Sequence, residues 1–91
     1  MLQDAWQRPP LEGPVYMTMI FELLRPKSVK PERRPWPHVA PDLDKLVRAV
    51  SDAMTGIVYR DDAQLVSGTF EKRYGDVPGV QISVTALESS A

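Results

Sequence analysis

The 91-residue sequence contains no cysteine, which excludes disulfides, thiolate zinc sites and cysteine nucleophiles. It also lacks any apolar run near the roughly 20 residues that a membrane-spanning helix needs. Its first ten residues, MLQDAWQRPP, include an acid and have no apolar stretch, which argues against a secretory signal. We therefore expect a cytoplasmic protein that does not associate with a membrane.

Acidic residues are scarce in one segment, RPKSVKPERRPWPHVAP (25–41), where Glu32 is the single acid. Its prolines prevent a continuous helix, so an extended loop is expected. The cations of this basic loop, together with Trp36 and His38, suit a phosphate backbone and an unstacked base. The alternative is a solvated loop whose Trp36 packs into the core. The expected DNA-binding cations are Arg25, Lys27, Lys30, Arg33 and Arg34.

The hydrophobic pattern predicts a single domain over residues 1–91. Apolar residues favour a buried strand over 15–24 and recur at helical spacing over 43–54. Strands over 64–74 and 80–86 flank the turn GDVPG and are expected to pair as a hairpin. Residues 1–13 are expected to be an N-terminal remnant containing a helix end at 4–8, and 87–91 a polar tail. The order β-α-β-β predicts an α/β or α+β fold, with a small mixed or antiparallel sheet covered by one main helix.

Acidic residues flank the predicted helix. Asp42 and Asp44 precede it and can point to the same side of an extended chain, while Asp61 and Asp62 follow it by a short turn. One of the first two could instead cap the helix. Three carboxylates in a chain without cysteine and with one histidine favour Mg²⁺. Whether Asp62 comes close to Asp42 is left open by the sequence.

The segment PDLDKLVRAVSDAMTGIVYRDDAQLV (41–66) resembles the core signature of RusA-type Holliday junction resolvases. That signature reads approximately P-D-x-D-N-L-x-K, then a helix containing D-A-L, a short apolar turn and D-D-x-Q-[IV]. The sequence matches this signature in residues and spacing at both acidic clusters, at DAM (52–54), at VYRDD (58–62) and at Gln64. The resemblance extends more loosely over 15–86.

The resemblance implies roles for individual residues. Asp42, Asp44 and Asp62 would bind Mg²⁺, with Mn²⁺ as a substitute, and would be required for cleavage. Asp61 would be structural or accept a hydrogen bond beside the site. Arg48 takes the place of the family lysine and would hold the scissile phosphate, or instead pair with Asp44 along the helix. Lys45 replaces the family asparagine and joins the DNA-binding set.

The function implied is a Mg²⁺-dependent endodeoxyribonuclease that resolves four-way DNA junctions by paired phosphodiester hydrolysis in recombination and repair. The family acts as a homodimer, and a bacterial or phage origin is expected. Lys72 and Arg73 would add DNA contacts, or would simply be solvated strand residues.

Family members usually begin with an N-terminal strand and a basic, proline-rich segment, neither of which is recognisable in this sequence, so we expect a form that is short at its N-terminus. The first alternative is therefore an inactive, truncated DNA-binding or interaction module, and the second a structural protein whose acids cap a helix. For the enzyme, the three carboxylates should lie within about 5 Å of one point. We also expect the sheet face carrying Tyr16, Thr18 and Ile20 to need an apolar cover from a second subunit.

Overall fold

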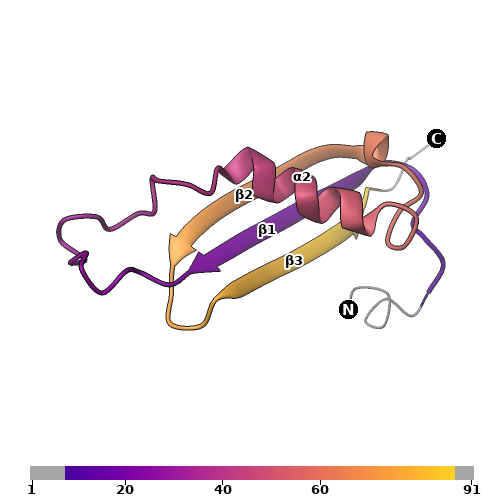
Figure 1. Ribbon diagram of the computed structural model, residues 1–91. Helices are drawn as coiled ribbons and strands as arrows, with labels where there is room; N and C mark the ends of the chain where they lie inside the picture. The colour runs from indigo at the N-terminus through magenta and orange to yellow at the C-terminus, as the bar shows by residue number, and fades with distance from the viewer. Residues whose placement is uncertain (1–7, 88–91) are drawn as a thin grey trace.

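The computed structural model describes residues 8–87 and contains one sheet, one main helix and a short 3-10 helix. In chain order these are β1 (Val15–Leu23), α2 (Leu43–Met54), η1 (Asp62–Gln64), β2 (Leu65–Tyr74) and β3 (Gly79–Ala86). Helix α2 covers one face of the sheet (Figure 1). The predicted α+β fold, a small sheet covered by one main helix, is thus confirmed. Most of the expected helix end at 4–8 and most of the polar tail at 87–91 lie outside the described residues.

The sheet is mixed, with the strand order β2-β1-β3. Strand β1 pairs in parallel with β2, placing Met17 opposite Gly68, and antiparallel with β3, placing Met19 opposite Ile82. The predicted hairpin between β2 and β3 is therefore wrong. The turn carries the chain past the end of β1 instead, and the Gly75 amide donates to the carbonyl of Leu23 at 3.0 Å. Because β1 is the most apolar strand, the central position buries it best.

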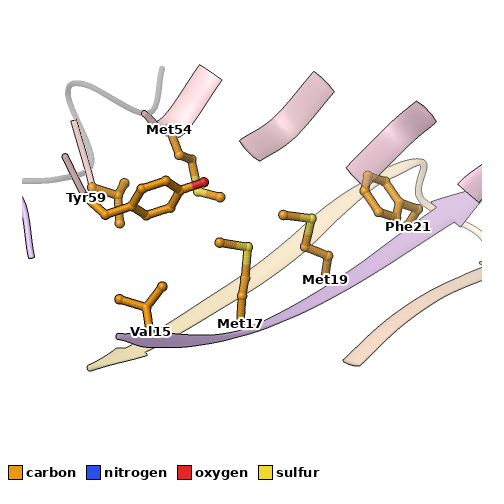
Figure 2. Packing of buried hydrophobic residues seen from close by; sticks show 7 residues of the cluster. Val15, Met17, Met19, Phe21, Met54 and Tyr59 are labelled. Atoms are coloured by element: carbon orange, nitrogen blue, oxygen red, sulfur yellow. The ribbon is translucent and has the colours of Figure 1, made fainter. Parts of the chain in front are cut away.

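The core lies between β1 and α2. Val15, Met17, Met19 and Phe21 alternate along β1, and all four side chains are buried on the α2 side (Figure 2). Met54, Val58 and Tyr59 complete the cluster at the C-terminal end of the helix. The Tyr59 hydroxyl donates to the carbonyl of Ser51 at 3.0 Å, which satisfies a buried polar group. This packing fixes α2, and with it the acids at its N-terminus, against the sheet.

The opposite face of the sheet is mainly polar. Tyr16 and Thr18 of β1 lie between Ser67 and Thr69 on one side and Thr85 and Ser83 on the other. The hydroxyls of Tyr16 and Thr69 are 2.7 Å apart. The expectation that this face needs an apolar cover is therefore wrong, because hydroxyl groups can remain in contact with water.

The part of the chain that the structure describes contains no helix that is both long enough and apolar enough to cross a membrane.

Candidate functional site

The acids before α2 are exposed to solvent. Asp42 occupies the N-cap position, and its carbonyl accepts from the Leu46 amide at 3.1 Å. Its side chain makes no capping hydrogen bond and instead lies 3.7 Å from the ammonium of Lys45. Asp44 is exposed in the first turn. The interpretation of Asp42 as a side-chain cap is thus not borne out by the geometry, and its carboxylate is accessible to a ligand.

Lys72 of β2 holds the chain that leads into Asp42. Its ammonium donates to the carbonyl of Val39 at 2.6 Å and to that of Pro41 at 2.8 Å. The sequence suggests either a DNA contact or a solvated strand residue at this position, and the structure shows a different role. Its neighbour Arg73 pairs with Glu71 at 2.8 Å. Lys72 therefore connects the position of Asp42 to the sheet.

The acids after α2 lie in a hydrogen-bonded turn. The Asp61 carboxylate accepts from the Ala63 amide at 2.9 Å and caps η1. The Gln64 carbonyl oxygen accepts from the amides of Arg60 and Asp61 at 2.8 and 2.9 Å. The Gln64 amide group donates to the carbonyls of Leu11 and Gly13 at 2.9 and 2.8 Å. Asp61 and Gln64 thus fix the backbone around Asp62, whose side chain is exposed.

The two acidic clusters lie at opposite ends of α2. A helix of 12 residues is about 18 Å long, and Asp62 belongs to the short coil that leads into β2 at the far end (Figure 1). Strand β2 returns toward Asp42 only as it reaches Lys72. Within residues 8–87, no three histidine or acidic side chains are grouped so that they could hold a metal ion. The expected convergence of Asp42, Asp44 and Asp62 is therefore not found within one chain.

Arg48 is exposed one helical turn after Asp44. The two side chains do not form an ion pair, so the expected pairing along the helix is absent. Both instead border a hollow of about 510 Å³ whose other lining residues are apolar: Leu43, Val47 and Phe70. Arg48 is thus free to meet an anion beside Asp44.

The basic loop is anchored to the end of β2. The guanidinium of Arg25 donates to the carbonyls of Arg34 and Pro35 at 3.2 and 3.3 Å. It also lies 4.5 Å from the centroid of the Tyr74 ring, with the Arg34 guanidinium at 6.0 Å. Arg25, expected to contact DNA, therefore holds the loop in place. Lys27, Lys30 and Arg33 are exposed.

A second hollow, of about 470 Å³, opens within the basic loop. It is lined by Ser28, Val29, Lys30, Arg33, Arg34 and His38. Trp36 is 57% exposed, so the interpretation that it packs into the core is wrong.

Tyr59 lies between the core and the second acidic cluster. Burial raises the pKa of its phenol, and the nearby carboxylates of Asp62 and Asp52 raise that pKa further. No sequence pattern indicates this position of Tyr59 or the role of Lys72 in holding the chain. Gln64, by contrast, already stands in the family signature.

Comparison with known proteins gives a family and a relative. The family described as endodeoxyribonuclease RusA matches residues 1–85. An uncharacterized protein of Bacillus subtilis (strain 168), YqaN, is 30% identical in a match of 88 residues. The match covers 87% of this chain and 62% of the relative. The chain thus spans less than two thirds of the length of that relative. No solved structure gives a significant match.

Proposed function

Because the chain belongs to the RusA family of endodeoxyribonucleases, we propose that it is a Mg²⁺-dependent endonuclease that cuts four-way DNA junctions by paired phosphodiester hydrolysis. The observation that carries the proposal is the family match over residues 1–85 together with both acidic clusters of the signature. Asp42, Asp44 and Asp62 are all exposed to solvent, as metal ligands that meet a bulky substrate need to be. The relative YqaN is uncharacterized and adds no activity of its own.

Asp42, Asp44 and Asp62 are the proposed metal ligands, because carboxylate oxygens are the ligands that Mg²⁺ prefers. A bound divalent cation would activate a water and neutralise charge on the scissile phosphate. Arg48 is proposed to hold a phosphate oxygen, since it is exposed and borders the same hollow as Asp44. Lys45, whose ammonium lies 3.7 Å from the Asp42 carboxylate, is proposed to add positive charge for DNA binding beside the acids.

A homodimer is proposed to complete the site. One chain holds its two acidic clusters at opposite ends of α2, and a single cation cannot bridge roughly 18 Å. A two-fold axis beside α2 would bring Asp62 of one subunit to Asp42 and Asp44 of the other. The same axis would create two equivalent sites, which suits paired cuts in the two strands of a junction.

A second candidate is a DNA-binding module without nuclease activity. It is favoured by the separation of the two acidic clusters within the described part of one chain. This candidate retains the basic loop as its functional surface and requires neither a metal nor a dimer.

A synthetic four-way junction and a linear duplex of the same sequence distinguish the two candidates. Opposing strands of the junction carry different labels, and the protein is added with Mg²⁺ or with a chelator. We expect cuts in both labelled strands of the junction with Mg²⁺ and no cut in the duplex. Junction binding without cleavage in Mg²⁺ would establish the binding module instead.

A further inference from the structure

The basic loop keeps a large aromatic side chain in water. Residues 24–42 connect the end of β1 to the start of α2 and form a lobe beyond the sheet (Figure 1). Trp36 lies in this lobe with 57% of its surface exposed. Exposed tryptophan is a frequent feature of binding sites, because its ring offers a large rigid contact area.

The backbone on both sides of Trp36 is held in place. The Arg25 guanidinium donates to the carbonyl of Pro35, and Pro37 is fully buried. The His38 amide donates to the Trp36 carbonyl at 2.9 Å, and Nδ1 of the same histidine lies 3.1 Å from that oxygen. A tryptophan on so fixed a backbone loses little conformational entropy when it binds a ligand.

The hollow within the basic loop is suited to an anion. Its lining includes the cations Lys30, Arg33 and Arg34 and no acid, since Glu32 does not border it. The amides of Arg33 and Arg34 both donate to the Lys30 carbonyl, which keeps these cations on one turn. Nε of Arg34 is buried without a partner, so one guanidinium donor remains unsatisfied. Arg34 and His38, which flank Trp36 in the chain, both line the hollow.

We propose that the basic loop binds one nucleotide step of unpaired DNA, with a backbone phosphate in the hollow and the neighbouring base stacked on Trp36. A base inside a duplex has both faces covered by its neighbours, whereas a base displaced at a branch point can stack on an aromatic ring. The proposal deepens the proposed function by naming the part of a junction that the loop recognises. The proposal rests on the proposed function only in taking DNA as the ligand. The binding itself requires neither a metal ion nor cleavage.

Binding to single-stranded oligo(dT) and to a linear duplex of equal length, both in chelator, tests the proposal. Trp36→Ala should weaken binding to oligo(dT) by about 5- to 100-fold, as expected for the loss of one stacked base, and leave duplex binding unchanged. Trp36→Phe should retain most of the affinity. Val77→Ala removes an exposed apolar side chain from the β2–β3 turn and serves as the matched control.

A spectroscopic measurement reports on stacking directly. In a Trp6→Phe protein, whose sole tryptophan is Trp36, oligo(dT) should quench the tryptophan fluorescence in chelator. Tryptophan fluorescence that stays unchanged at saturating oligo(dT) would overturn the proposal. The proposal would also be overturned if a folded Trp36→Ala variant lost equal affinity for oligo(dT) and for the duplex. Selective loss of oligo(dT) binding in a protein that does not cleave junctions would support this inference while refuting the nuclease.

Discussion

Lys72 and Val39, which stand 33 positions apart, are joined by a hydrogen bond of 2.6 Å from the lysine ammonium to the valine carbonyl. The same ammonium reaches the carbonyl of Pro41 at 2.8 Å, directly before Asp42. A cation near the C-terminal end of β2 is thus engaged by two neutral carbonyls. The consequence is that β2 fixes the end of the basic loop and the first acidic cluster together.

Replacing Lys72 should therefore impair cleavage without altering how many phosphates the protein neutralises. Lys72→Met frees both carbonyls and should slow junction cleavage, while the slope of log affinity against log salt stays unchanged. Lys72→Arg should restore part of the rate because it can still donate to the carbonyls. A slope that falls by about one unit in Lys72→Met would show that Lys72 contacts a phosphate instead.

Gln64 should contribute to stability through its four hydrogen bonds. Gln64→Ala breaks the bonds to Arg60, Asp61, Leu11 and Gly13. We expect a loss of about 1–3 kcal/mol in the free energy of unfolding, measured by urea denaturation. Gln81→Ala, on the exposed face of β3, is the matched control and should change stability by less than about 0.5 kcal/mol. Equal effects of the two substitutions would contradict this role of Gln64.

The cations that line the hollow of the basic loop should dominate the salt dependence of DNA binding. The double variant Arg33→Ala, Arg34→Ala should bind DNA more weakly. The slope of log affinity against log salt should become shallower by about one unit for each phosphate that is no longer neutralised. Arg60→Ala is the control, because Arg60 is exposed but lies outside the loop and pairs with Glu12. If the double variant binds with the affinity and slope of the wild type, the loop is a connector.

Tyr59 should make stability fall at high pH. Its pKa in the folded state is raised above the ordinary value of 10.0, chiefly by burial. The folded state therefore retains the phenol proton more strongly than the unfolded state, and this contribution is fully present below pH 10. It should be lost as the pH rises through the folded pKa. Denaturation from pH 8 upward should show a steeper decline for the wild type than for Tyr59→Phe, and parallel curves would refute the assignment.

The sequence predicted the elements well because their signals are local. The alternation in β1 and β3 and the helical spacing of 43–54 depend on neighbouring residues, and all three elements are present. The pairing of strands was predicted incorrectly, since GDVPG indicates a turn but not which strand lies beside it. The parallel partner of β2 proved to be β1, reached through α2.

The relative position of the acids in space could also not be predicted from the sequence pattern. Residue spacing matches Asp42, Asp44 and Asp62 to the family signature, yet the first two lie at the N-terminal end of α2 and Asp62 lies beyond its C-terminal end. Because β2 begins at the C-terminal end of α2, Asp62 remains at that end. The hydrogen bonds from Lys72 could not be foreseen, since backbone carbonyls carry no sequence signal.

Cleavage by mixed subunits tests the proposed nuclease most directly. Asp42→Asn and Asp62→Asn chains are unfolded and refolded together, then incubated with a labelled four-way junction and Mg²⁺. Asp76→Asn, which removes a charge from the β2–β3 turn, serves as the matched control and should cut like the wild type. If the acids are shared across a two-fold axis, each variant alone is inactive, while the mixed dimer has one intact site and nicks a single strand. A mixture that remains inactive under conditions where the wild type cuts both strands would contradict the shared site, and cleavage by either variant alone would contradict the ligand assignment.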